Sequence, residues 1–524
     1  MRALKAFRYS FSAVLAMTVL MPLSAASPKT LPSEMKAQES VPALIDFSAR
    51  NHSSSKVVFT ITNYGMFGQY QDPGLLDPGE FYPGCEFPKG SGILHCYNGA
   101  LWVGAIVGTD TLVSVGDDGW QHLNEMFPDA GPGEIIRRSN RANDPDFSSD
   151  AIADEEYIAD YFDTLSHPAY TGTNPFDGRQ HTPLGLKIRQ HSYSFGGSPN
   201  DDYILVKYTL TNIGEKYLNK VFVGGYFDSD VWHRSTPSGF MDDFSGSRWV
   251  RAENGVDSFL VGFAADDDGD PVGLESWDNH SARSVFSATF LDVPDDANLG
   301  FNWWFSNGDP GHDWGPRLAA HDRPFGTGGQ GTPEGDRNKY YVMSQPENDY
   351  CQLWDYVDMT EEGWAPPYFE GPIFDMVTYD TKFLISFGGF DLAPGDSVNF
   401  GLAIVLGENL HRNPGDFHDL FDTSNPQTFY NTLDFSDLER NVKAANEMYS
   451  HLLYGMAGDI DNSGRIDLKD VVAIVNYLFA RGESPRFRNV ADVNGDCKIN
   501  LSDIVLLVRY LYRNGQLIRS GCVE

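Results

Sequence analysis

The chain has 524 residues and a formal net charge of −35, because 73 Asp and Glu outnumber 38 Lys and Arg. Binding to nucleic acid or to anionic lipid needs clustered basic side chains, so this composition argues against both partners. Hydrophobic residues make up 41% of the chain and aromatic residues 13%, which is enough for a sizeable packed core and excludes a mainly disordered protein.

The N-terminus has the features of a secretory signal peptide. Basic residues open the chain, an apolar stretch occupies residues 11–23, and small side chains at residues 24–26 form a cleavage site. We therefore expect residues 1–26 to be removed and the mature protein to be extracellular or associated with a cell surface. No later segment has ~20 consecutive apolar residues, so no membrane span is predicted in the mature protein.

Residues 27–50 are mixed and polar and are predicted to form a linker. The pattern of strands begins after it, because apolar and polar side chains alternate over residues 57–61 with the period of a half-buried strand. Two apolar runs, residues 101–107 and 112–115, are separated by a short turn that contains Thr and Asp. This pattern predicts a β-hairpin.

Later apolar runs predict five more strands, at residues 183–195, 203–211, 221–227, 383–387 and 398–406. The turn residues 212–216 predict that the third of these strands folds back beside the second, and residues 394–396 predict the same for the last two. The body, residues 51–430, is therefore expected to be mainly β. It forms one β-sandwich-like domain, or two with a boundary at 250–290.

One helix is predicted in the connecting segment 431–457. Ser436 and Glu439 have the spacing of a capping box, and Gly455 stands where a helix commonly ends. Between them apolar side chains recur at helical spacing, namely Leu438, Val442, Ala445, Tyr449 and Leu452. We expect this helix to pack on the body and to connect it to a last, all-α module at residues 458–515.

The C-terminal module contains an internal repeat. Residues 459–470 and 492–503 share one pattern of polar and apolar side chains, and every aligned pair is 33 residues apart. The same offset continues beyond these segments, where it relates Ile466 to Ile499, Leu468 to Leu501, Tyr477 to Tyr510 and Leu478 to Leu511. A repeat this regular indicates two copies of one loop–helix unit.

The oxygen-bearing side chains of both segments have the spacing of calcium ligands. Calcium takes about 6–8 oxygen ligands, and a loop of about 12 residues supplies them from positions 1, 3, 5, 7, 9 and 12. The first loop offers Asp459, Asp461, Ser463, the carbonyl of Arg465, Asp467 and Asp470; the second offers Asp492, Asn494, Asp496, the carbonyl of Lys498, Asn500 and Asp503. The sequence therefore predicts two calcium ions in this module.

Residues 458–515 resemble the type I dockerin family. Asp instead of Glu at position 12, and the missing or short helix before each loop, distinguish this EF-hand-like repeat from an ordinary EF-hand. Two departures from the expected loop are Cys497 at position 6, where Gly is usual, and the neutral ligand Ser463. The resemblance implies a cohesin-domain partner on a scaffold or surface protein. It also implies recognition through positions 10 and 11 of each loop, which are Leu468, Lys469, Leu501 and Ser502.

The body carries no comparably specific motif, so its catalytic residues stay unassigned. Dockerins often accompany enzymes of polysaccharide catabolism, so a body that binds or degrades polysaccharide is the first hypothesis. An enzyme here would be a glycoside hydrolase, which needs two carboxylates ~5–9.5 Å apart. The best local cluster is Asp228, Asp230 and His233 after a strand end. The alternative is a non-catalytic, extracellular structural or cell-surface protein.

Two further groups in the body are candidates for ligand binding. Asp266, Asp268 and Asp270 alternate along the chain and can hold a structural calcium ion, or they can form a solvated hairpin tip. A cluster of aromatic side chains can stack on sugar faces if exposed, or form core if buried; it consists of Trp303, Trp304 and Trp314.

Five cysteines are present in a chain that we expect to be exported, so disulfides are permitted. Cys85 and Cys96 are close in sequence and can pair. Cys497 can pair with Cys522 in the tail, residues 516–524, which leaves Cys351. Other pairings remain open, because sequence alone does not choose between them.

Overall fold

The structure is a computed structural model that describes residues 47–513 with internal gaps, and also Ile518 and Gly521. The gaps are residues 69–82, 118, 120–123, 129–133, 167–170, 172, 174–177, 179, 253–257, 306–330, 346–350, 356–377, 423, 462–465 and 486. The expected signal peptide and most of the predicted linker lie outside the described residues.

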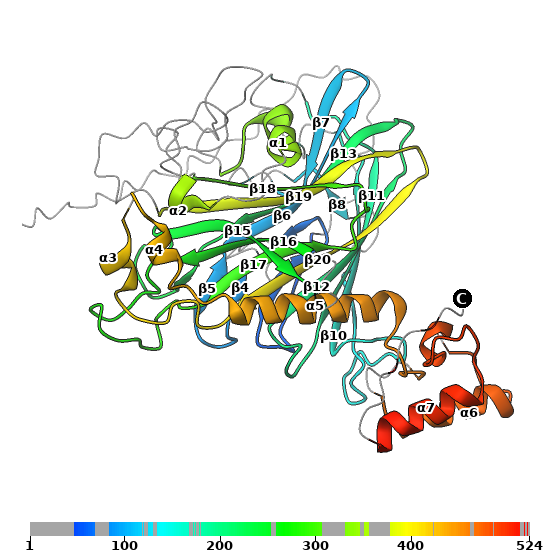
Figure 1. Ribbon diagram of the computed structural model, residues 1–524. Coiled ribbons are helices and arrows are strands. Elements are labelled where there is room, and N and C mark those ends of the chain that lie inside the picture. Colours follow the sequence, from blue (N-terminus) through cyan, green and yellow to red (C-terminus); the bar gives the residue numbers. More distant parts are fainter. Residues whose placement is uncertain are drawn as a thin grey trace, which may run out of the picture. The chain divides into compact units, whose positions relative to one another are not determined.

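The strands of the body form two antiparallel sheets (Figure 1). The first contains β1 (Ala49–His52), β2 (Val58–Thr62), β3 (Met66–Phe67), β4 (Cys85–Glu86), β5 (Ile93–Cys96), β6 (Asn98–Val107), β7 (Asp110–Val115), β13 (Leu218–Asp228), β14 (Trp232–His233), β18 (Asn298–Phe305) and β19 (Thr381–Leu392). Their order is β14-β5-β4-β2-β3-β6-β13-β19-β18, with β1 beside β2 and β7 beside β6. The pairing of β6 with β7 confirms the predicted hairpin.

The second sheet contains β8 (Phe127–Pro128), β9 (Ile136–Arg138), β10 (Glu155–Asp163), β11 (Leu186–Ser194), β12 (Tyr203–Asn212), β15 (Asp243–Arg251), β16 (Ser258–Asp266), β17 (Val285–Leu291) and β20 (Ser397–Gly407). Their order is β15-β16-β17-β20-β12-β11-β10-β8, with β9 beside β10. Because β20 pairs with both β12 and β17, this sheet joins strands from either side of residues 250–290.

Aromatic side chains fill the space between the two sheets. The ring centroid of Phe227 on β13 lies 5.4 Å from that of Phe286 on β17, and Phe387 on β19 lies 4.8 Å from Phe290. One continuous cluster of buried side chains includes residues of both sheets. The body is therefore a β-sandwich, as the strand pattern predicts, and its core is built mainly by burial of apolar area.

Two of the predicted hairpins are wrong, although the strands themselves are present. β12 pairs with β11 and β20, whereas β13 pairs with β6 and β19 in the other sheet. Likewise, β19 belongs to the first sheet and β20 to the second. The connection from β12 to β13 and that from β19 to β20 therefore both cross from one sheet to the other. These connections lie side by side, because the backbone N–H of Gly395 donates to the carbonyl of Asn212 at 2.8 Å. Turn residues permit a change of direction but do not decide whether the next strand stays in the same sheet.

The helices are α1 (Gly335–Ser344), α2 (Gln352–Asp355), α3 (Asp416–Leu420), α4 (Gln427–Tyr430), α5 (Ser436–Tyr454), α6 (Leu468–Phe479) and α7 (Leu501–Tyr512), with a 3₁₀ turn at Arg488–Ala491. Of these, α1 packs on the first sheet and α5 on the second. α5 approaches β20 closely at two glycines, where an added Cβ would meet the ring of Tyr449 at 2.5 Å and Leu438 at 2.9 Å. No helix among the described residues is both long and apolar enough to cross a bilayer.

The predicted capping box of α5 is wrong. Phe435 occupies the N-cap position and no side chain caps the helix, so Ser436 is already its first helical residue. Glu439 instead pairs with Arg248 at 2.8 Å, and that guanidinium lies over the ring of Phe435 at 4.0 Å. This tertiary pair replaces the local one, because a charged partner on β15 competes for the Glu439 carboxylate. The helix ends at Gly455, as predicted, with a φ of 76°.

The cysteines follow the sequence expectation only in part. Cys85 on β4 and Cys96 on β5 lie opposite one another across the ladder, but both are thiols, so the expected bond between them is not formed. Burial raises the pKa of both thiols and keeps them protonated. Cys497 is disulfide-bonded, whereas Cys522 lies outside the described residues.

Candidate functional site

The sequence repeat is also a structural repeat. The core of the C-terminal module has three pairs of buried side chains at the 33-residue offset, namely Ile460 with Val493, Val471 with Ile504, and Ile474 with Leu507. Val490 and Ala491 are the only other fully buried apolar residues of this core in the described part of the chain. Such a core is small, so the module needs a further source of stability.

The last ligand position of each loop also holds the start of the following helix. Asp470 accepts a hydrogen bond from the N–H of Ile460 at 2.7 Å and, through its other oxygen, from that of Asp467 at 2.7 Å. Asp503 accepts in the same way from the N–H of Asn500 at 2.9 Å. Asp467 and Asn500 are the N-caps of α6 and α7, each in a complete capping box. The last residue of each loop is also held to the beginning of that loop, through the N–H of Ile460 in the first loop and, at 3.3 Å, through that of Asn494 in the second.

Carboxylates converge in the first loop. Oxygens of Asp459, Asp461 and Asp470 lie within 4.8 Å of one another. Burial, with a contribution from the nearby charge of Asp461, raises the pKa of Asp470. Such crowding of like charges costs free energy that a bound cation relieves. Ser463 and Arg465 lie outside the described residues, so their predicted role stays a prediction.

In the second loop, ligand side chains accept hydrogen bonds from the backbone of the loop itself. Asp492 is buried, and one of its oxygens accepts hydrogen bonds from the N–H groups of Gly495 at 3.0 Å and Asp496 at 3.1 Å. The side chain of Asn494 accepts from the N–H of Asp496 at 2.8 Å. Cys497 adopts a φ of 61° at the position where glycine is usual, so the loop makes the same turn at some cost in backbone strain.

Comparison with known families identifies this module. Residues 457–512 match the dockerin type I domain. Dockerin domains bind calcium, and the match confirms the resemblance that the repeat indicated. It covers only the C-terminal module and says nothing about the body.

The body has weaker likenesses. No curated protein sequence matches the chain. A putative aldose 1-epimerase from Escherichia coli K12 is 10% identical, with a TM-score of 0.22, over 69% of this chain and 99% of the other. A putative kojibiose phosphorylase from the human microbiome is 6% identical, with a TM-score of 0.24, over 79% of this chain and 37% of the other. Likenesses at this level assign neither fold nor activity.

The dockerin domain exposes a row of apolar side chains on each helix. On α6 these are Leu468, Val472, Val475 and Phe479, and on α7 they are Leu501, Val505, Val508 and Tyr512. Their spacing places each row on one helical face, and every residue has its counterpart 33 positions away. Phe479 is 68% exposed and Tyr512 is 65% exposed, which is unusual for large apolar side chains. Only the first residue of each row, Leu468 and Leu501, was predicted from the sequence as a binding residue; the other six were not.

Positions 10 and 11 of both loops lie where α6 and α7 begin. Leu468 and Leu501 are the first residues of the two helices, and Lys469 and Ser502 follow them. All four are exposed. Their backbones are fixed, because the N–H groups of Lys469 and Ser502 donate to the N-cap side chains at 2.6 and 2.8 Å. The four predicted recognition residues are therefore accessible at one end of each apolar row.

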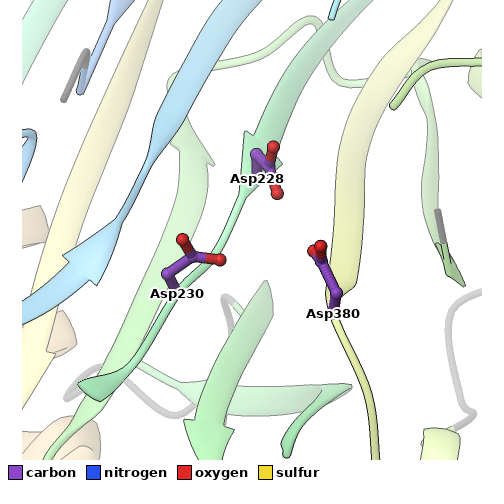
Figure 2. A group of neighbouring side chains, drawn as sticks. All are labelled: Asp228, Asp230 and Asp380. Carbon is purple, nitrogen blue, oxygen red and sulfur yellow. The ribbon is translucent and has the colours of Figure 1, made fainter. Parts of the chain in front are cut away.

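Of the predicted cluster of Asp228, Asp230 and His233, the structure brings only the two carboxylates together. Asp228 and Asp230 converge with Asp380, and oxygens of the three lie within 4.8 Å of one another (Figure 2). The buried amine of Lys382 lies 3.0 Å from Asp228 and also pairs with Asp380. Burial and its carboxylate neighbours raise the pKa of Asp230. His233 instead contacts Ser235 at 2.7 Å and stacks on His280.

This cluster resembles a buried network of ion pairs and not a pair of catalytic carboxylates. Asp228 is 2% exposed and Asp380 4% exposed, so a polysaccharide chain does not reach them. Lys382 supplies the positive charge that the crowded carboxylates require. Sequence reasoning missed Asp380 and Lys382, since both lie about 150 residues from Asp228 and only the pairing of β13 with β19 brings them close.

The hypothesis that Trp303 and Trp304 form a sugar-binding platform is wrong. Both side chains are fully buried. The indole of Trp304 stacks on Tyr226, with ring centroids 5.7 Å apart, and on Trp102 at 6.5 Å, in a second core that also contains residues of α1. The rings are part of the hydrophobic core, and burial of such large apolar surfaces stabilises the fold. Trp314 lies outside the described residues.

Proposed function

We propose that this protein is an extracellular or cell-surface component that is attached to a cohesin domain through its calcium-loaded dockerin domain. The observation that carries the proposal is the pair of exposed apolar rows on α6 and α7. Exposed apolar side chains in such a row are typical of a protein-binding surface. The high negative charge of the chain suits a calcium-rich extracellular environment.

The dockerin domain would hold two calcium ions. In the first loop the ligands are Asp459, Asp461, Ser463, the carbonyl of Arg465, Asp467 and Asp470; in the second they are Asp492, Asn494, Asp496, the carbonyl of Lys498, Asn500 and Asp503. The burial of Asp459, Asp470, Asp492 and Asp503 supports this assignment. Calcium would neutralise these carboxylates and fix the loops against the helices.

The repeat offers two related binding faces. The row on α6 ends in Phe479 and the row on α7 ends in Tyr512, and position 11 is Lys469 in one and Ser502 in the other. A cohesin domain can therefore meet either face, and the two complexes would differ in charge and in one aromatic hydroxyl. We infer two binding orientations of unequal affinity.

Substitutions at the start of each row test this proposal. We expect Leu468→Asp or Leu501→Asp alone to weaken cohesin binding less than about 10-fold, because the other face remains. The double variant should lose about 100-fold or more, as when buried interface anchors are removed from both faces. Binding of the calcium-loaded full chain to a panel of immobilised cohesin domains measures both effects.

Ile136→Asp is a matched control, since Ile136 is an exposed apolar residue of the body (49% exposed, against 56% for Leu468). Its binding should equal that of the wild type. Equal binding by the double variant would contradict the assignment of the apolar rows, and failure of the wild-type protein to bind any cohesin domain would contradict the docking function.

Polysaccharide binding is the second candidate function of the body. A pocket of about 690 Å³ lies on the second sheet and includes the carboxylates Asp150 and Glu156 and the stacked rings of His191 and Tyr193. Glu156 is fully engaged, since it accepts from two backbone N–H groups and pairs with His191 at 3.0 Å. This favours binding over glycoside hydrolysis, which needs an available acid and base.

A panel of soluble and insoluble polysaccharides, with reducing-sugar release recorded in the same wells, tests this candidate. We expect retention of the full chain on a subset of the panel and no release of reducing sugar. Release would instead establish a glycoside hydrolase. No retention on any polysaccharide would favour the non-catalytic structural body.

A further inference from the structure

Three carboxylates converge where β16 ends and the following loop begins, and a fourth lies on a neighbouring segment. The three are Asp266, Asp268 and Asp270, and one oxygen of each lies within 4.8 Å of the others. Asp242 comes just before β15, the neighbouring strand, and its carbonyl accepts a hydrogen bond from the N–H of Asp267 at 3.1 Å. Because Asp243 pairs with Asp266 in the ladder of β15 and β16, Asp242 lies beside this group of carboxylates.

The loop repeats the conformation of the second dockerin loop. Residues 266–270 read Asp-Asp-Asp-Gly-Asp, and residues 492–496 read Asp-Val-Asn-Gly-Asp. The glycines have φ values of 77° and 73°. In both loops the first Asp accepts from the N–H at its fifth position, at 3.2 Å in the body and 3.1 Å in the dockerin domain. The third residue accepts from that same N–H at 2.8 Å in each.

The second observation is that oxygens of this cluster are buried without a hydrogen-bond partner. Asp266 is 1% exposed; its Oδ1 accepts from backbone N–H groups, while its Oδ2 has no partner. The same holds for Oδ2 of Asp270 and Oδ1 of Asp242. Leaving a buried, ionised carboxylate oxygen in this state is costly, because nothing replaces the water that it loses on burial. The site thus presents carboxylate oxygens that a bound cation can satisfy.

No cationic side chain among the described residues forms an ion pair with Asp242, Asp266, Asp268 or Asp270. Arg283 is nearby in sequence, but its guanidinium donates to the carbonyl of His411 and lies over Trp277. His411 donates to the carbonyl of Asp266 at 2.8 Å and forms no ion pair with these four carboxylates. The protein itself therefore supplies no balancing charge in the described part of the chain.

We propose that Asp242, Asp266, Asp268 and Asp270 bind a third calcium ion, in the body, independently of the dockerin domain. Four carboxylates and added water reach the oxygen count that calcium prefers, and the loop has the geometry of a calcium loop. The ion would join β15 to β16 at the end of the sheet. Its role is therefore to stabilise the body.

Melting followed by tryptophan fluorescence tests this proposal on the full chain. All ten tryptophans precede residue 457, so this signal reports the body and not the dockerin domain. Calcium at millimolar concentration, compared with a chelator, should raise the melting temperature of the body by about 3–5 °C. Equilibrium dialysis should find three calcium ions per chain.

Asp268→Asn and Asp242→Asn should each remove most of the calcium-dependent rise in the melting temperature of the body. Each should also reduce the number of bound calcium ions per chain to two. Neither residue is fully buried, and in chelator both variants should melt no lower than the wild type, because one of four repelling carboxylates is neutralised. Asp296→Asn, on an exposed turn, is the matched control and should behave as the wild type.

The proposal would be overturned if the melting temperature of the wild-type body did not depend on calcium. It would also be overturned if the calcium-dependent rise in melting temperature persisted in both variants. Calcium binding by the dockerin domain is measured separately, from the circular dichroism of its helices α6 and α7. Failure of one proposal is therefore distinguishable from failure of the other.

Discussion

Chelation of calcium should unfold the dockerin domain while the body remains folded. Its core has only eight fully buried apolar residues in the described part of the chain, and the four carboxylates buried beside them repel one another without a cation. Each site at about 1,000 times its Kd would contribute about 4 kcal/mol, which is comparable to the whole stability of so small a module. Circular dichroism at 222 nm should therefore report loss of the α6 and α7 helices when chelator is added.

Tryptophan fluorescence in the same sample should report a body that is still folded. Re-addition of calcium should restore the helical signal, whereas magnesium should restore less of it, because magnesium needs a smaller octahedral site. Asp503→Ala should lose the helical signal of α7 even in calcium. A helical signal that is insensitive to chelator would contradict both calcium assignments in this domain.

Lys382→Met should cause the largest loss of stability expected from a single substitution in the body. The amine of Lys382 is fully buried and pairs with Asp228 and Asp380, so its removal takes a buried positive charge away from a cluster of three carboxylates that includes Asp230. Breaking a buried ion pair from one side costs about 3–5 kcal/mol. Guanidinium unfolding followed by tryptophan fluorescence measures this loss.

The loss should depend on pH. Burial and the charges of Asp228 and Asp380 raise the pKa of Asp230, and Lys382 opposes that rise. Without the amine, the destabilisation should therefore be small near pH 4 and grow as the pH rises and Asp230 ionises. Lys187→Met is the control, since Lys187 forms a half-exposed pair with Asp160 at 3.8 Å and should cost less than about 1 kcal/mol. A loss in Lys382→Met as small as that of the control, or one independent of pH, would show that the cluster is solvated.

The two parts of the chain differ in how far the sequence predicted them. In the dockerin domain the repeat and the helices follow from positions within 33 residues, and the family match confirms the resemblance to the type I dockerin family. In the body eight strands were predicted and others, such as β10 and β15 to β18, were missed, and two hairpins were assigned to strands that belong to different sheets. The side chains of Trp303 and Trp304 were compatible with surface or core, and their burial was decided by α1 and the first sheet.

The sequence by itself determined the repeat, the dockerin resemblance and the β character of the body, because these depend on local spacing along the chain. Only the tertiary structure decided which strands pair, and with them which charged groups meet. Asp380 and Lys382 reach Asp228 through the pairing of β13 with β19, and Asp242 reaches Asp266 through that of β15 with β16. Such contacts depend on strand order, which is set by burial summed over both sheets and has no local signal in the sequence.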